Sequence, residues 1–367
     1  MPDSRLAKFA YVLLHYSCNV KKNQLVKLIG GVEAIPLLKE LVAECLAIGA
    51  NPYMKITVED IDEIFLKNAK KDQLTFVSPI AKYEIEKLDT LIGIRSPSNT
   101  KFLSGVNPQK QVLAHKSQTK IMRRFSIRAA KGELSWVGTL MPTNAAAQDA
   151  GMSLSDYEDF VYGACMLDTK DPIAEWKKMS KYNGRLINYL KKKKVIRLVA
   201  PDTDLTFNVG GRKWINCDGN NNFPDGEVFT APIENSANGH IRFTFPAVYS
   251  GREVNDVRIE MKNGKVVKAT AAHGEDFMNA MLDMDKGSRY LGEVAIGTNF
   301  GIKKFTRNIL YDEKIGGTFH MAMGDSYPES GGKNKSALHW DMICDLRKKG
   351  AMYADGQLFF KNGKFLK

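Results

Sequence analysis

The pattern of the sequence changes at about residue 195, and this change constrains the fold more than any other feature of the chain. Before it, apolar strand-like runs alternate with segments of helical spacing, whereas after it strand-like runs follow one another. Alternating strands and helices are typical of a parallel sheet, and a chain of 367 residues is long enough for two domains. We therefore expect an α/β N-terminal domain with a mainly parallel sheet over residues 1–190 and a strand-rich α+β C-terminal domain over residues 191–367.

The N-terminal half contains one well-defined supersecondary unit. Residues 24–30 (QLVKLIG) form a short apolar run, residues 32–50 place apolar side chains on one helical face, and residues 52–58 (PYMKITV) return to strand character. This order predicts a βαβ unit, and hence parallel strands. The predicted helical face consists of Leu37, Leu38, Leu41, Val42 and Cys45.

Local signals define further elements on both sides of residue 195. Residues 134–143 (LSWVGTLMPT) predict a strand, and Ser155 with Glu158 has the spacing of a capping box, which predicts that a helix starts there. Two Asn-Gly pairs, at 263–264 and 362–363, lie between alternating segments. Since Asn-Gly is the strongest short hairpin signal, we expect a β-hairpin at each pair.

The composition indicates in which cellular compartment the protein is found and which classes of partner it binds. Five cysteines are scattered and never paired as CxxC, which favours free thiols in a reducing compartment, so a cytoplasmic location is expected. The chain has no run of eighteen apolar residues and no convincing signal peptide, so no membrane association is expected. The net charge of +12 raises the possibility of an anionic partner, but the densest run, Lys191–Lys194, has no interleaved aromatic residues. A solvated basic surface is therefore favoured over nucleic-acid binding.

Several common catalytic motifs are absent from the sequence. It has no phosphate-binding GxxxxGK[ST] loop and no dinucleotide GxGxxG fingerprint, and HExxH and GxSxG are missing as well. Any chemistry must therefore be assembled from scattered residues.

Four segments of the C-terminal half place an acid or a histidine in a strand-like run that is flanked by glycine or a turn. They are FPDGEVFTAP with Glu227, YLGEVAIGTN with Glu293, GTFHMAMGDSYP with His320, and ALHWDMICDL with His339 and Asp341. Carboxylates and imidazoles are the donors that hold hard and borderline divalent cations. His339 and Asp341 are two residues apart, so on a strand both project from one face toward a shared point.

Each of these residues also has an ordinary structural interpretation. The His339 and Asp341 pair fits the solvated face of a strand, Glu227 fits an exposed position after a turn, and His320 fits a satisfied core histidine. Glu293 lies in an apolar run, where a carboxylate is costly unless it is paired or bound to a metal. Tyr327 lies in a predicted loop, from which it either reaches into a cleft or packs on its own loop.

Taken together, these motifs resemble the thermophilic aminopeptidases, a metallopeptidase family of the aminopeptidase T, S and II type. The resemblance rests on NFPDGEVFTAPIENSANGHIRF, YLGEVAIGTN, GGTFHMAMGDSYPESGG and ALHWDMI, which occur in the family's order, and on FAYVLLHYSCNVKKNQLVKLIG in the N-terminal half. It covers nearly the whole chain. It implies a metal-dependent aminopeptidase that removes N-terminal amino acids from peptides with a free N-terminus.

The resemblance also implies a cofactor and residue roles. Two divalent ions per subunit, of zinc, cobalt or manganese, would be held by the family's ligands, which match Glu227, Glu293, His320, His339 and Asp341. Glu293 would be the bridging or base-like carboxylate, and Tyr327 would donate a hydrogen bond to the developing oxyanion. A homodimer is expected on the same basis.

Two alternatives remain open at this point. One is a metal-dependent dipeptidase or another small-amide hydrolase, which would use the same metals. The other, from a different class, is a basic binding protein with a vestigial metal site. One departure from the family is the segment between His320 and His339, which is more compact than usual and puts loop contacts, substrate specificity and subunit packing in question.

Overall fold

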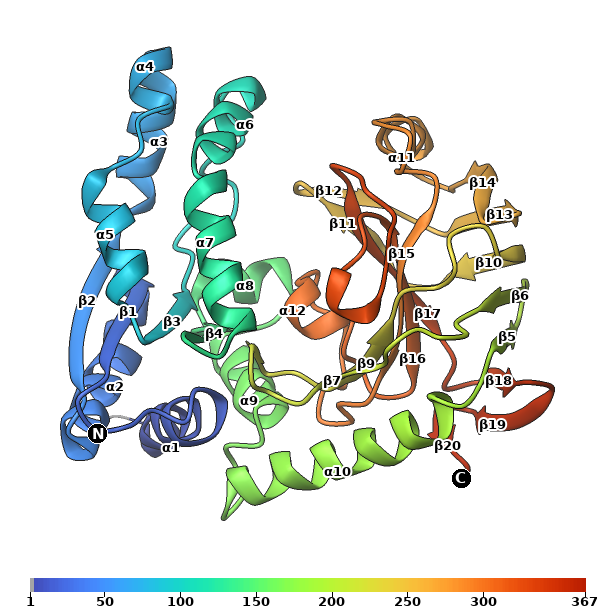
Figure 1. Ribbon diagram of the computed structural model, residues 1–367, viewed down its shortest axis with the longest axis horizontal. Coiled ribbons are helices and arrows are strands. Elements are labelled where there is room, and N and C mark those ends of the chain that lie inside the picture. Colours follow the sequence, from blue (N-terminus) through green and yellow to red (C-terminus); the bar gives the residue numbers. More distant parts are fainter. Residues whose placement is uncertain (1–2) are drawn as a thin grey trace. The chain divides into compact units, whose positions relative to one another are not determined.

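The computed structural model describes residues 3–367 and divides into two compact units (Figure 1). Unit 1 comprises the chain up to Ile173 together with Gly219–Phe223, and unit 2 comprises Ala174–Asp218 and Pro224–Lys367. The domain limits expected at residues 190 and 191 stay a prediction, because compactness alone does not establish which segments fold independently.

Unit 1 is built on a parallel sheet of five strands in the order β2-β1-β3-β4-β8. The strands are β1 (Leu25–Gly31), β2 (Asn51–Thr57), β3 (Thr90–Arg95), β4 (Ser135–Leu140) and β8 (Asn222–Phe223). The helices are α1 (Ser4–Val12), α2 (Ile35–Ile48), α3 (Glu59–Asn68), α4 (Lys71–Leu74), α5 (Pro79–Lys87), α6 (Pro108–Ser117), α7 (Thr119–Ala130), α8 (Asn144–Asp149) and α9 (Leu154–Ala164). The predicted βαβ unit is confirmed as β1-α2-β2, with parallel strands.

The predicted apolar face of α2 is largely correct. Leu37, Leu38, Leu41 and Cys45 are buried, and Val42 is half-buried. The predicted start of α9 is wrong by two residues. Ser153, not Ser155, is its N-cap, because the Ser153 side chain accepts a hydrogen bond of 3.1 Å from the backbone N–H of Asp156.

Unit 2 contains two larger antiparallel sheets and a short two-stranded one. The eight-stranded sheet has the order β14-β13-β10-β6-β5-β18-β19-β20, and the five-stranded sheet has the order β17-β16-β15-β9-β7. The strands of the eight-stranded sheet are β5 (Val195–Ala200), β6 (Thr203–Asn208), β10 (Asn238–Phe243), β13 (Val257–Lys262), β14 (Lys265–Thr270), β18 (Ala351–Ala354), β19 (Gln357–Lys361) and β20 (Lys364–Phe365). Those of the five-stranded sheet are β7 (Ile215–Cys217), β9 (Glu227–Thr230), β15 (Leu291–Gly297), β16 (Thr318–Gly324) and β17 (His339–Asp345). The remaining elements are β11 (Ala247–Tyr249), β12 (Arg252–Val254), α10 (Pro172–Leu190), α11 (Glu275–Leu282) and α12 (Ile309–Asp312).

Both predicted hairpins are confirmed. Asn263 and Gly264 join β13 to β14 with φ angles of 49° and 80°, and Asn362 and Gly363 join β19 to β20 with φ angles of 48° and 77°. Positive φ at both central residues is what a two-residue hairpin turn with the right-handed strand twist requires.

The core of unit 2 lies between its two larger sheets (Figure 1). Phe207 of β6 stacks on Phe319 of β16 with ring centroids 6.0 Å apart, and side chains of both sheets belong to one buried apolar cluster. The five-stranded sheet therefore has one face directed into this core. The opposite face of this sheet does not contribute to the core, so a polar site can form there.

All five cysteines in the described part of the chain are free, as expected. Among the helices of residues 3–367, none combines the length and the apolar character that crossing a membrane requires.

Candidate metal centre

The side chains of the five-stranded sheet alternate between the core and the opposite face. On β16, Phe319, Met321 and Met323 belong to the apolar core, so His320 and Ala322 between them face the other way. The same alternation applies on β17, where Trp340, Met342 and Cys344 lie in the core. It places His339 and Asp341 on the face of the sheet that carries His320. Cys344 is thus directed away from this face, as the sequence predicted.

The two remaining predicted ligands reach this face from β9 and β15. Val228 of β9 is in the core, and its neighbour Glu227 is not. On β15 the register shifts between Leu291 and Glu293, and beyond this bulge Glu293 pairs with Ala322.

Pairing across the strands then aligns the carboxylates. Ala322 of β16 lies between Glu293 on β15 and Asp341 on β17. Because an alanine side chain is short, the two carboxylates have room to extend over it. All five predicted ligands therefore lie on one face of one sheet.

Measured distances confirm that these side chains form one cluster. His320 Nε2 lies 3.3 Å from Glu227 Oε2 and 3.5 Å from Glu293 Oε1. His339 Nε2 lies 3.9 Å from Glu293 Oε2 and 3.6 Å from Asp341 Oδ2. The two oxygens of Glu293 thus face two different histidines, which makes Glu293 the central member of the cluster.

The cluster contains buried polar atoms that the protein itself does not satisfy. Glu227 and Glu293 are each 5% exposed and His320 is 0% exposed, so the alternative of an exposed Glu227 is excluded. Among the described residues, Glu227 Oε2 and both ring nitrogens of His320 have no hydrogen-bond partner. Such atoms are costly in a protein interior unless something binds them. A divalent cation fits this donor set of carboxylate oxygens and imidazole nitrogens.

The electrostatics of the cluster agree with its burial. Burial raises the pKa of Glu227 to about 8 and also raises the pKa of Glu293. Burial opposes protonation of His320, but the neighbouring Glu293 and Glu227 outweigh it and raise the pKa of His320 to about 10. Without a metal the cluster therefore holds protons at neutral pH, which offset part of its negative charge.

Glu227 depends on a tight turn at the start of β9. Gly226 has a φ of 123°, and a Cβ atom there would lie 2.6 Å from the Cβ of Asn299. Asn299 Nδ2 also donates a 2.8 Å hydrogen bond to the Asp225 carbonyl. Only glycine fits this close approach, which gives a physical reason for the PDGE sequence that precedes β9.

His339 is oriented by a backbone contact. Its Nδ1 is 2.9 Å from the carbonyl oxygen of Asp325, so Nδ1 carries the proton and Nε2 is the atom directed at the carboxylates. The Tyr327 ring packs edge-on against the His339 ring at 5.1 Å and against Phe229 at 5.6 Å. Tyr327 is 47% exposed, so it borders the cluster and also meets solvent. Partial burial and the negative charge of Glu293 raise the pKa of Tyr327, which keeps its hydroxyl protonated.

The compact segment between His320 and His339 is held by a dense hydrogen-bond network. Asp285 accepts hydrogen bonds from the backbone N–H of Ala337 at 2.7 Å and from the Ser336 hydroxyl at 2.9 Å. Asn334 Nδ2 donates to the carbonyls of Gly287 at 2.9 Å and Gly324 at 2.6 Å. These bonds fix the loop that carries Tyr327 and leads into His339.

Two members of the cluster were missed by sequence reasoning. Glu313 offers a carboxylate oxygen that lies within 4.8 Å of donor atoms of His320 and Asp341. Lys314 is 0% exposed, pairs with Glu313, and has its Nζ 3.9 Å from Glu227 Oε1. Both follow the four-residue helix α12 in an irregular segment, where no periodic pattern distinguishes them from surface charges. The one available signal was an acid adjacent to a base near the apolar side chains of Tyr311 and Ile315.

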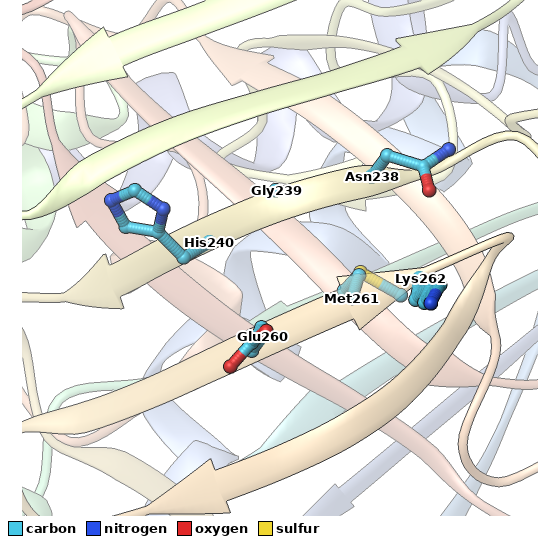
Figure 2. A pocket seen from close by; sticks show the side chains of 6 residues that line it. All are labelled: Asn238, Gly239, His240, Glu260, Met261 and Lys262. Carbon is cyan, nitrogen blue, oxygen red and sulfur yellow. The ribbon is translucent and has the colours of Figure 1, made fainter.

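A surface depression elsewhere on unit 2 is unrelated to this cluster. It is lined by Asn238, Gly239, His240, Glu260, Met261 and Lys262 (Figure 2). These residues belong to β10 and β13 of the eight-stranded sheet, where His240 pairs with Glu260. The predicted site residues are not among those that line it.

These donors could hold a divalent metal ion, and comparison with known proteins agrees with that chemistry. A family model described as thermophilic metalloprotease (M29) matches residues 2–365. The chain is 26% identical to aminopeptidase 2 of Geobacillus stearothermophilus, covering 93% of this chain and 92% of that protein. It is also 26% identical to aminopeptidase PepS of Streptococcus thermophilus, covering 98% of each.

The fold has a counterpart among solved structures. Wild-type AmpT from Thermus thermophilus superimposes with a TM-score of 0.82 over 99% of both chains at 22% identity. The predicted fold class is thereby confirmed. The chain belongs to the thermophilic metalloprotease family, and it is a hydrolase that acts on peptides.

The protonation of the cluster predicts how metal binding depends on pH. A bound cation requires deprotonated Glu227 and His320, whose pKa values are raised to about 8 and about 10, so binding must displace protons below these values. We expect release of about one or two protons at pH 7 and an apparent affinity that increases as the pH rises from 6 toward 9. Calorimetric titration of manganese or zinc in buffers of different ionisation heat measures both. Identical heats in all buffers, with a pH-independent affinity, would contradict the assignment.

Proposed function

We propose that this chain is an aminopeptidase that uses two divalent ions, held by Glu227, Glu293, His320, His339 and Asp341 with Glu313 as a further ligand. The observation that carries the proposal is the position of Glu293, whose oxygens face His320 and His339 separately. One ion would bind to Glu227, Glu293 and His320. A second would bind to Glu293, His339 and Asp341, within reach of Glu313. Glu293 belongs to both groups of donors.

Metal identity is argued from the donor atoms. The proposed ligands offer oxygen and imidazole nitrogen and no thiolate, a set that suits zinc, cobalt or manganese. Cys217 shares a donor group with Asp225 and Glu227 but with neither histidine of the cluster, so we do not count it as a ligand.

The residues of the cluster have distinct parts in peptide hydrolysis. When bound, divalent ions polarise a substrate carbonyl and lower the pKa of water toward neutrality. Glu293, buried at the centre, would accept the proton of the attacking water and pass it to the leaving amine. Tyr327, with a protonated hydroxyl at the edge of the cluster, would donate a hydrogen bond to the oxygen on which negative charge develops.

The polar groups of the site suit a free N-terminus. The α-amino group of a peptide would coordinate a bound ion or meet one of the carboxylates of the cluster, which are Glu227, Glu293, Glu313 and Asp341. An acetylated terminus offers no such amine. The names of the relatives, which are all aminopeptidases, support the same reaction.

A homodimer and a cytoplasmic location are also retained as proposals. The first rests on the resemblance to the family, and the second on cysteines that are free throughout the described chain. Light scattering of the purified protein at micromolar concentration tests the first.

Metal-dependent activity is the first expected outcome. Purified protein should release chromophore from several amino-acid p-nitroanilides, lose this activity in chelator, and regain it with added zinc, cobalt or manganese. N-acetylated substrates should remain uncut, because they lack the charged amine. Cleavage of acetylated substrates would favour a general small-amide hydrolase, and chelator-insensitive or absent release would count against the proposal.

Substitution of the central carboxylate tests its role. Glu293→Gln should reduce kcat at least about 10²-fold, since a general base contributes 10²- to 10⁴-fold and a carboxylate oxygen that would hold metal is lost as well. Glu260→Gln, on β13 of the other sheet, is the matched control and should retain wild-type kcat. Near-normal turnover of Glu293→Gln in folded protein would remove Glu293 from the mechanism.

The role of Tyr327 is separable from metal binding. Tyr327→Phe should lower kcat by about 10²- to 10³-fold, the range found for one oxyanion donor, while KM and metal content measured by mass spectrometry stay close to wild type. Tyr353→Phe, on β18, serves as the control. If kcat of Tyr327→Phe equals that of the control, Tyr327 does not stabilise the oxyanion.

A further inference from the structure

Lys314 is a fully buried lysine inside the acidic cluster. Its backbone is fixed on both sides, because its N–H donates a 3.0 Å hydrogen bond to the Tyr311 carbonyl and its own carbonyl accepts a 3.1 Å bond from Asn299. Its side chain is 0% exposed. The Nζ atom pairs with Glu313 Oε1 and lies 3.9 Å from Glu227 Oε1.

A buried ammonium needs a specific reason to be where it is. Lysine is almost never fully buried unless it is paired, because removing an ion from water is energetically costly. Burial alone would favour the neutral amine, but the Nζ atom has the carboxylates of Glu313 and Glu227 beside it, which are the partners that a buried ammonium requires. The structure therefore provides for a charged Lys314 at this position.

The partners of Lys314 are themselves proposed metal ligands. Glu227 belongs to the donor group with Glu293 and His320, and Glu313 belongs to the group with His320 and Asp341. Lys314 thus contacts one carboxylate from each group. Its charge opposes that of an incoming cation at both positions, and it attracts both carboxylates when no cation is bound.

We propose that Lys314 is a positioning residue, a permanent internal cation that holds Glu227 and Glu313 in place in the metal-free protein and thereby weakens the binding of divalent ions. This inference rests on the proposed metal centre. Two consequences follow from linkage. Loss of the lysine charge leaves the carboxylates to repel one another, which destabilises the metal-free protein. A bound cation relieves that repulsion, so metal binding becomes tighter and stabilises the fold more.

The experiment compares Lys314→Met with wild type in two measurements. Calorimetric titration of chelator-stripped protein with manganese or zinc gives the affinity, and thermal unfolding in chelator and in excess metal gives the metal-induced shift. We expect Lys314→Met to unfold at a lower temperature in chelator, to bind the first metal at least about tenfold more tightly, and to show a larger metal-induced shift.

A matched control distinguishes the effect of removing a charge at the proposed metal centre from the effect of removing any buried lysine. Lys27 of β1 is 8% exposed and pairs with Glu84, remote from the cluster in sequence and in another unit. Lys27→Met should lower the unfolding temperature and leave the metal affinity unchanged. An equal change of affinity in both variants would contradict the inference.

The remaining outcomes are distinguishable. If wild type binds no divalent metal, the proposed centre is wrong and the inference falls with it. If wild type binds metal and Lys314→Met binds with equal or weaker affinity, only the inference is wrong. Should Lys314→Met fail to fold in chelator, Glu313→Gln combined with Lys314→Met removes both charges of the pair and is expected to fold. Failure of the double variant as well would assign the role of Lys314 to packing rather than charge.

Discussion

The alternation of side chains along four strands is the constraint on which the rest of unit 2 depends. β9, β15, β16 and β17 each bury an apolar set against the eight-stranded sheet, and every second residue is thereby directed to the opposite face. A shift of one residue in any of these strands would exchange the two sets, placing carboxylates in the apolar core. The packing of Phe319, Met321 and Trp340 therefore also decides the position of His320, His339 and Asp341.

This arrangement concentrates groups that are unfavourable in isolation. Carboxylates and imidazoles on neighbouring strands repel or share protons when buried, and Glu227 and His320 keep polar atoms without a hydrogen-bond partner among residues 3–367. The surrounding structure tolerates this cost because the apolar core on the reverse side of the same sheet is large. Lys314 lies within the cluster, and its positive charge offsets part of the negative charge of the carboxylates.

Prediction from sequence succeeded where a local signal had a single physical meaning. Both Asn-Gly hairpins were found because only a few residues accept positive φ at two consecutive positions. His339 and Asp341 were placed on one face because strand geometry has a period of two. The cap of α9 was misplaced by two residues, because two serines compete there and the difference lies in which one reaches a free backbone N–H. Glu313 and Lys314 were missed because they lie in an irregular segment, whose path depends on contacts with Asn299 and not on local pattern.

The sequence by itself determined the classes of the two halves, the hairpins and the chemical types of the five proposed ligands that the family resemblance selected. These features depend on residues that are close together in the chain or on short sequence motifs. Tertiary structure alone decided which carboxylates share a space, since Glu227 and Asp341 are separated by more than a hundred residues and meet only through the register of the intervening strands. It also decided that Lys314 is buried among acids instead of exposed to water. Burial is a property of the assembled sheet and its covering segment, and no single stretch of sequence contains it.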